Sequence, residues 1–425
     1  MLANGLKTSR RNPWFWIPSL YLAEGFPNAV VVTVAVVLLK NLGMDNGRVA
    51  FFTSLLYLPW VIKPFWAPFV DMFSTKRKWI VLMQMAIFIG LGAVSGALHT
   101  PFWLSITLGA LWWAALSSAT HDIAADGFYM LALNEQQQAF YVGIRSTFYR
   151  AANMLASGGV VWLAGRLVSG GNDPSAAWSL MFAAMALLFL IFALWHWMIL
   201  PVPESDVANK ANGARQILGD FVNTFVTFFR KPGIGVAMAF MLLYRLPEAI
   251  LGKMVQPFLL DKTIDGGLQL TTEQVGLANG TFGVAGIVLG GIVGGIVMSR
   301  FGLRKCLWPM ALMLTLPSGF YCYLAFALPS DMTLICSGIA LEQFGYGFGF
   351  TAYMMYMMMF CEGSEYTTSH YAFCTGLMAL GLMLPAMASG WIQQAIGYQD
   401  FFSLVMILCV VTFIVTAIAY KNMKR

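Results

Sequence analysis

Long apolar runs, separated by short polar segments rich in lysine and arginine, follow one another along almost the whole chain. A helix crosses the hydrocarbon core of a bilayer in roughly 20 apolar residues. Runs of that length predict twelve membrane-spanning helices, at residues 14–39, 48–70, 79–98, 102–131, 139–168, 175–200, 233–260, 273–298, 306–328, 332–360, 367–396 and 401–420. An even number of crossings places both ends of the chain on one side of the membrane.

The composition is that of a protein surrounded by lipid. Of the 425 residues, 59% are hydrophobic and 10% are charged, whereas soluble domains carry roughly 25% charged residues. We therefore expect an all-α integral membrane protein with twelve transmembrane helices.

Basic residues are distributed unequally between the two sides of the predicted helices. One side, which holds both chain ends, has sixteen: Lys7, Arg10, Arg11, Lys76, Arg77, Lys78, Lys210, Arg215, Arg230, Lys231, Arg300, Arg304, Lys305, Lys421, Lys424 and Arg425. The other side has four: Lys40, Arg48, Arg166 and Lys262. By the positive-inside rule the first side, with both termini, is cytoplasmic. The net charge of +6 then reflects topology and attraction to anionic lipids, and nucleic acid is not an expected partner.

Similar stretches in the first and second parts of the chain indicate an internal repeat. LYLAEGFPNAV is similar to LLYRLPEAIL, which aligns Pro27 with Pro247, and ASGGVVWL is similar to ASGWI. Asp71 and Ser299 occupy equivalent places before basic clusters. These matches predict two pseudo-symmetric six-helix halves.

The predicted halves are residues 1–200 and 233–425, and a polar cytoplasmic linker at 201–232 joins them. Part of this linker is predicted to be an amphipathic helix that lies on the inner membrane surface. Its apolar stripe consists of Ile217, Phe221, Phe225 and Phe228.

Ten ionisable residues lie inside the predicted spans, although a charge at the centre of a membrane helix costs on the order of 2.5–3.5 kcal/mol. Arg245 and Glu248 lie three residues apart, on one helical face near mid-membrane, with Pro247 between them. They are either a self-neutralising ion pair or a switch linked to substrate or protons. Lys253, farther along the same helix, is expected to extend to the outer interface.

A second group of charges lies in the segment THDIAADGFY. Asp122 and Asp126 are one helical turn apart, and Arg145 and Arg150 on the next span are the expected cations. This pattern predicts either a charge relay that closes an inner gate or plain structural ion pairs. No further histidine or cysteine lies near His121 in sequence, so we expect no metal there.

Lys63 lies among Trp60, Pro64 and Trp66 in the inner half of the second span. Its side chain either extends to the cytoplasmic surface or holds an anionic sugar derivative, because a cation beside aromatic rings suits such a ligand. The sequence is compatible with both interpretations.

Motifs of ATP-driven and hydrolytic enzymes are absent from the sequence. It contains no GxxxxGK[ST] phosphate loop and no HExxH or GxSxG motif. A polytopic membrane enzyme would also need catalytic polar clusters at a membrane face and long loops, whereas the predicted loops are short. We therefore expect a protein that is not an enzyme and binds no cofactor.

The two six-helix halves resemble the major facilitator superfamily. The loop GIVMSRFGLRK also resembles that superfamily, because it follows the pattern G-x-x-x-D-[RK]-x-G-[RK]-[RK] apart from Ser299. Five stretches resemble AmpG-type muropeptide permeases: LLYRLPEAILGKMVQPFLL, HDIAADGF, FYRAANMLASG, VIKPFWAPFVD and LEQFGYGFGFTAYM with YTTSHYAF. Glu24 and Pro64 depart from that family's pattern. The resemblance implies a site near the bilayer midplane that is exposed alternately to each side. It also implies proton-driven import of anhydro-muropeptides across the bacterial inner membrane.

The charged and aromatic residues, together with the resemblance, predict roles for residues in three groups. Substrate binding is expected of Tyr57, Trp60, Lys63, Tyr149, Arg150, Tyr244, Arg245, Gln343 and Tyr346. Proton coupling is expected of Glu24, Glu248 and Glu342, and gating by ion pairs is expected of Asp71, Asp122, Asp126 and Arg145. The expected partners are a small-molecule substrate, protons and membrane lipids, and the protein is expected to be monomeric. The alternative is a facilitator for another anionic metabolite, such as a CoA ester or a sugar acid, because related acetyl-CoA carriers share the same arrangement of membrane helices.

Overall fold

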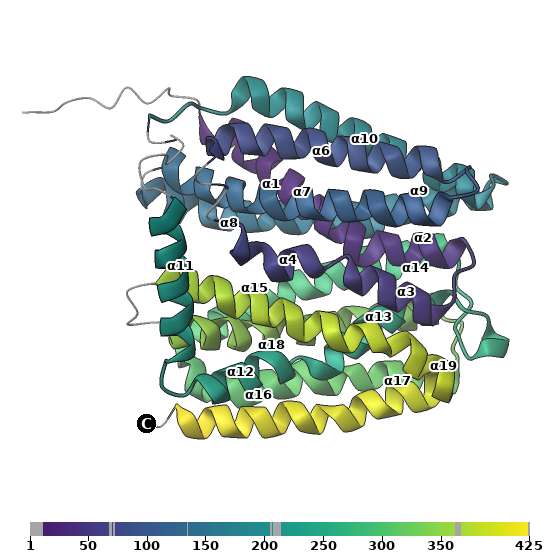
Figure 1. The fold of residues 1–425 in the computed structure, drawn as a ribbon. Helices are drawn as coiled ribbons and strands as arrows, with labels where there is room; N and C mark the ends of the chain where they lie inside the picture. The colour runs from purple at the N-terminus through teal and green to yellow at the C-terminus, as the bar shows by residue number, and fades with distance from the viewer. Residues whose placement is uncertain are drawn as a thin grey trace, which may run out of the picture.

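The computed structural model describes residues 12–67, 70, 73–133, 135–204, 206, 214–361 and 367–423, and all of its regular elements are helices. Figure 1 shows them as a bundle of long, roughly aligned helices, with α11 running across one end. The N-side helices precede α11 and the C-side helices follow it. We call the contact between these two sets the seam.

The N-side elements are η1 (Pro13–Phe15), α1 (Ile17–Ala29), η2 (Val30–Val34), α2 (Ala35–Asn41), α3 (Asn46–Leu55), α4 (Leu58–Ile62), η3 (Lys63–Phe65), α6 (Lys76–Ala97), α7 (Trp103–Ala132), α8 (Glu135–Met154), η4 (Leu155–Val160), α9 (Val161–Ser169) and α10 (Pro174–Ile199). The C-side set follows α11 (Ala214–Phe229). It comprises α12 (Ile234–Leu243), α13 (Leu246–Leu260), η5 (Thr263–Asp265), α14 (Thr272–Val275), η6 (Gly276–Gly283), α15 (Val284–Phe301), α16 (Leu303–Thr315), η7 (Leu316–Ser318), α17 (Gly319–Ala327), α18 (Met332–Cys361) and α19 (Thr367–Asn422).

Eight helical stretches among the described residues are long and apolar enough to cross a membrane: 13–41, 76–97, 147–169, 174–199, 234–260, 272–298, 303–327 and 373–422. The last is 50 residues long and changes direction at Gly397, which has a φ of 76°. The helices α7 and α18 have 30 residues each, so their length suffices but their sequences are less apolar. The remaining predicted span falls on the broken segment α3–α4.

Capping side chains explain where several helices begin. The carboxylate of Asp45 accepts a hydrogen bond from the amide of Arg48 at the start of α3, at 2.9 Å, and Asp173 caps α10 in the same way. Thr271 and Gln274 form a capping box at the start of α14. Such caps satisfy backbone N–H groups that have no partner within the helix.

The two prolines that the sequence repeat aligns both lie at interruptions of helices. Pro27 lies inside α1, just before the π-helical segment η2. Pro247 lies at the start of α13, where Tyr244 and Arg245 separate it from α12. Proline lacks a backbone N–H and clashes with the carbonyl four residues earlier, so it weakens helical hydrogen bonding.

The seam is closely packed where η4 crosses η6. A Cβ added to Gly280 would lie 2.1 Å from the Cα of Gly158, so only glycine allows this approach. A second close contact joins α3 to α19, because a Cβ on Gly390 would lie 2.1 Å from the carbonyl oxygen of Asn46. Both contacts hold an N-side helix directly against a C-side helix.

Gly280→Leu is therefore expected to separate the two π-helical segments and to lower the free energy of unfolding by about 1–3 kcal/mol, as overpacked substitutions do. The melting temperature of the purified protein in detergent measures this change. Gly295→Leu is the matched control, because Gly295 lies in α15 and a Cβ added to it would meet no other atom within 4 Å. Equal melting temperatures for the two variants would contradict the tight crossing.

Candidate functional site

Two ion pairs lie side by side among the N-side helices. The ammonium of Lys63 in η3 contacts the carboxylate of Asp122 in α7. One turn later in α7, Asp126 accepts a hydrogen bond from Arg145 of α8 at 2.7 Å. The guanidinium of Arg145 lies 4.6 Å from the centre of the Tyr21 ring. Thus Arg145 pairs with Asp126 as expected, whereas the partner of Asp122 is Lys63 rather than Arg150.

A third carboxyl group joins this cluster from α1. Glu24 is 7% exposed, and its Oε2 has no hydrogen-bond partner among the described residues. It lies beside both Asp122 and Asp126. We call Glu24, Lys63, Asp122, Asp126 and Arg145 the N-side cluster. With three acids and two cations, the cluster carries one negative charge unless it binds a proton or a cation.

Arg245 is the centre of the C-side charges. Its Nη2 lies 3.0 Å from a carboxylate oxygen of Glu248, and the same nitrogen donates a hydrogen bond to the hydroxyl of Tyr346. The rings of Tyr346, Phe350 and Tyr353 surround the guanidinium at 4.8–5.9 Å. Arg245 is only 5% exposed. The aromatic rings enclose its guanidinium, and Glu248 neutralises the charge.

Glu342 of α18 is the other buried acid on the C side. Its carboxylate accepts a hydrogen bond of 2.8 Å from the amide of Gln343, and no described cation lies within ion-pair distance. Tyr244 was expected to bind substrate, but it is fully buried and stacks on Tyr353 at 5.5 Å. Its hydroxyl donates to the carbonyl of Gly349. These contacts favour a packing role for Tyr244.

The expected substrate residues Tyr57, Trp60 and Tyr149 lie in or beside the N-side helices. Tyr57 stacks on Trp60 with ring centres 5.5 Å apart, and it lies within electrostatic range of Lys63 and Arg245. Tyr149 packs against α1 at Gly25. Asp71, the fourth expected gate residue, lies outside the described residues.

Arg150 of α8 extends across the seam. A Cβ on Gly291 in α15 would lie 2.9 Å from its guanidinium. No described carboxylate lies within ion-pair distance of Arg150, which distinguishes it from Lys63, Arg145 and Arg245. Its charge is therefore not neutralised by the partners that the sequence suggested.

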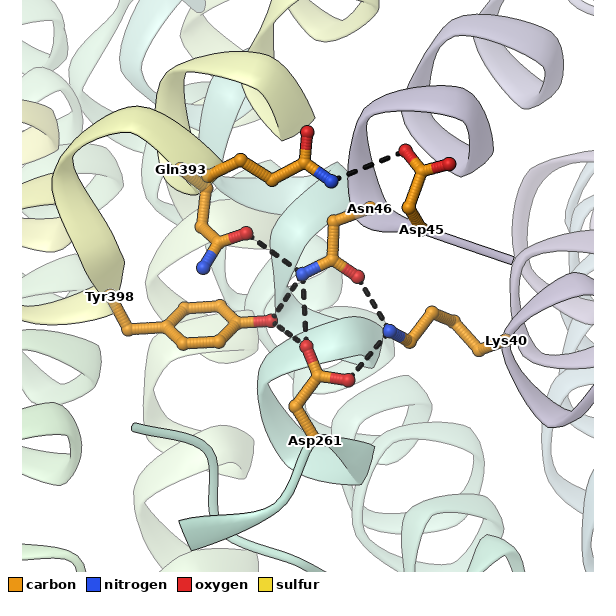
Figure 2. Close-up of polar contacts among 7 residues, drawn as sticks. Lys40, Asp45, Asn46, Asp261, Gln393 and Tyr398 are labelled. Carbon is orange, nitrogen blue, oxygen red and sulfur yellow. Dashed lines mark hydrogen bonds and ion pairs between the residues drawn. The ribbon is translucent and has the colours of Figure 1, made fainter. Parts of the chain in front are cut away.

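Polar side chains join the two sides of the seam at the end of the bundle opposite α11 (Figure 2). The ammonium of Lys40 lies 2.6 Å from Asp261, and the amide of Asn46 donates to Asp261 at 2.9 Å and to Gln393 at 2.8 Å. The hydroxyl of Tyr398 donates to Asp261 at 2.6 Å. We call these five residues the latch.

The latch joins α2 and α3 to α13 and α19, and sequence analysis did not identify it. Asn46 and Asp261 are 215 residues apart, and nothing in their local sequences marks them as partners. A cavity of about 650 Å³ opens beside the latch and is lined from both sides of the seam, including by Lys40 and Asp261 themselves. The side chains of Lys40 and Asp261 are 12% and 18% exposed.

A buried chain of hydrogen bonds among the N-side helices was also missed. It links Ser19 to His196 at 2.9 Å, His196 to Gln84 at 3.0 Å, and Gln84 to His121 at 2.9 Å. His121, His196 and Gln84 are fully buried. His121 therefore bonds to an amide, and the described residues contain no group of three or more His, Cys, Asp or Glu side chains that could hold a metal ion.

Lys253 does not occupy the place that its sequence position suggested. Its ammonium donates a hydrogen bond of 3.2 Å to the hydroxyl of Thr53 in α3, so it faces the seam rather than the outer interface. The reason is the helical register of α13, which places Lys253 on the side that α3 contacts.

Comparison with known proteins supports a transport role for this arrangement. The chain is 24% identical over 426 residues to "Putative transporter AmpG 4" of Rickettsia conorii, covering 96% of both chains. It is 24% identical over 396 residues to "Anhydromuropeptide permease" of Escherichia coli K12, covering 90% of this chain and 74% of that protein. Its fold matches a crystal structure of a mutant of the nucleoside transporter NupG with a TM-score of 0.71, at 14% identity over 97% of this chain and all of the other.

These findings confirm the predicted resemblance to the major facilitator superfamily and its AmpG-type permeases. They identify a multi-pass membrane transporter rather than an enzyme. A model of the BT1 family matches residues 24–360, which include the N-side cluster and Arg245 with its partners. The chain therefore belongs to the BT1 family.

Proposed function

We propose that this transporter imports muropeptide-like solutes, the anhydro-sugar peptides of cell-wall turnover, together with protons. The observation that carries the proposal is a set of buried and half-buried ionisable residues around the seam. Some of them are bonded to a protein partner, some face the seam, and some do both. Charges at mid-membrane are costly in lipid and typically mark substrate or proton pathways. The relative named "Anhydromuropeptide permease" supplies the substrate class.

The proposed topology has twelve transmembrane helices in two pseudo-symmetric halves, with both termini in the cytoplasm of a bacterium and the helices in its inner membrane. The α11 end then faces the cytoplasm, where basic residues are concentrated. The latch end faces outward. Because the latch joins the halves at that end, the described state is closed to the outside. Alternating access requires one such state and one that is open to the outside.

The N-side cluster and the Arg245–Glu248 pair have different proposed roles. On the N side, three acids share two cations, so a proton can be taken up and released without leaving the cluster more than singly charged. On the C side, Arg245 and Glu248 form a neutral pair in an aromatic cage. Arg150 and the stacked Tyr57 and Trp60 are placed to hold acidic and sugar groups of the solute, because aromatic faces suit sugars and cations suit carboxylates.

Uptake by proteoliposomes tests the proposal. Purified protein is reconstituted, its orientation is measured, and labelled anhydro-disaccharide tripeptide is added outside under an imposed inward proton gradient. Accumulation is expected to stop when the gradient is dissipated with a protonophore. An acetyl-CoA ester and a sugar acid are run in parallel. Uptake of one of these but not of the muropeptide, by correctly inserted protein, would replace the proposed substrate.

A further inference from the structure

Lys253 is a cation on the seam without a charged partner. Its ammonium has three N–H donors, and among the described residues it bonds only to the hydroxyl of Thr53. Thr53 in turn donates to the carbonyl of Val49 at 2.7 Å, so its oxygen is the acceptor in the bond with Lys253. No described carboxylate lies within ion-pair distance of this lysine, whereas Arg245 on the same helical segment is neutralised by Glu248.

Open space lies next to this lysine on α13. Gly252 is exposed, and a Cβ added to it would meet no atom within 4 Å. Glu248, Gly252 and Gln256 are spaced by four residues, so they form one stripe along the helix, and Lys253 lies beside it. A stripe of acid, glycine and amide beside a lysine that contacts α3 faces the seam, not lipid. The space beside Gly252 is therefore part of the seam.

A second polar group on the same stripe also lacks a partner. Gln256 is 7% exposed, and its side-chain Oε1 accepts no hydrogen bond from any described residue. Across the seam, the hydroxyl of Ser54 in α3 is 1% exposed and likewise has no partner among the described residues. Buried polar groups are generally hydrogen-bonded. The Gln256 and Ser54 oxygens have almost no accessible surface, so the group that points to a ligand is the ammonium of Lys253, which has no charged partner and lies beside the open space at Gly252.

We propose that Lys253 and the space beside Gly252 form a subsite that binds a carboxylate of the transported solute. This rests on the proposed function and deepens it by naming the cation that recognises the solute's negative charge on the C side. The ammonium of Lys253 binds the carboxylate. Lys253 lies eight residues beyond Arg245, about 12 Å along the helix.

The first test compares anhydro-disaccharide tripeptide with its analogue in which the peptide carboxylates are amidated, in proteoliposome uptake. Lys253→Met is expected to raise KM for the carboxylate form roughly ten- to a hundredfold, as loss of a charge-assisted hydrogen bond does. It should change KM for the amidated form by less than about threefold, and Lys253→Arg should restore most of the preference. An equal change for both probes would mean that Lys253 only supports the helix contact, and would overturn the subsite.

The second test does not depend on the identity of the solute. Gly252→Cys places a thiol in the open space, in a background with the six native cysteines replaced. Modification rates are measured with a negatively charged and a positively charged methanethiosulfonate reagent. The negative reagent is expected to react faster, and the preference should disappear when Lys253→Met is added. Preference for the positive reagent, or no effect of the lysine, would overturn the proposal. If this preference is observed but the wild type does not transport muropeptide, the subsite stands and the proposed substrate fails.

Discussion

Replacing Glu24 with glutamine is expected to abolish uptake driven by a proton gradient while leaving exchange of labelled for unlabelled substrate within about threefold of the wild type. Glutamine keeps the size of the side chain but can neither bind nor release a proton. The N-side cluster then contains two acids and two cations, and it no longer carries the charge that a proton would neutralise. Gradient-driven accumulation in proteoliposomes should fall at least tenfold, because the transport cycle loses the group that couples it to protons.

The matched comparison is Glu248→Gln, because sequence analysis expected Glu248 to take part in proton coupling as well. The contacts favour a different result. Glu248 neutralises a guanidinium that is 5% exposed, and removing one partner of a buried ion pair typically costs about 3–5 kcal/mol. Accumulation and exchange should therefore fall together in Glu248→Gln, along with the melting temperature. Loss of exchange in Glu24→Gln as well would show that Glu24 supports the structure of the cluster rather than proton coupling.

The sequence predicts the fold of this protein better than it predicts the contacts of the candidate site. Length and apolarity of segments suffice to place most helices, and the aligned Pro27 and Pro247 both lie at helix interruptions, because proline acts on local backbone bonding. Ion pairing depends on register between helices. The sequence brought Arg145 to Asp126 but could not show that Lys63, rather than Arg150, reaches Asp122.

Uncharged and distant partners were beyond sequence reasoning altogether. The latch depends on Asn46, Gln393 and Tyr398. These residue types are common in helices, and placing an uncharged polar side chain in a membrane helix costs too little free energy to single them out in the sequence. Lys253 was assigned to the outer interface because its depth was estimated from the sequence, whereas its direction is set by the packing of α13 on α3. Charges at mid-membrane are conspicuous in a sequence, but their partners depend on tertiary structure.

Breaking the latch is the second substitution with a large expected effect. Asp261 accepts bonds from Lys40, Asn46 and Tyr398, so Asp261→Ala removes the acceptor on which both sides of the seam converge. If the latch holds the outer end closed, the loss of about 1–3 kcal/mol of differential stability shifts the ratio of outward-open to closed molecules roughly 5- to 150-fold. Spin labels on Arg48→Cys and Ile264→Cys, which lie on opposite sides of the seam, report this as longer distances in pulsed electron resonance.

Two controls separate the latch from general loosening of the seam. Arg166 and Glu273 also pair across it, but at 3.9 Å and with the arginine 67% exposed. Such exposed pairs contribute little, about 0–1 kcal/mol, so Arg166→Ala should leave the distances unchanged. Exchanging the charges with Lys40→Asp and Asp261→Lys restores the ion pair but not the bonds from Asn46 and Tyr398, and should return part of the population to the closed state. If Asp261→Ala leaves the distances as in the wild type, the latch is a consequence of closure and the Gly158–Gly280 and Gly390–Asn46 contacts carry it instead.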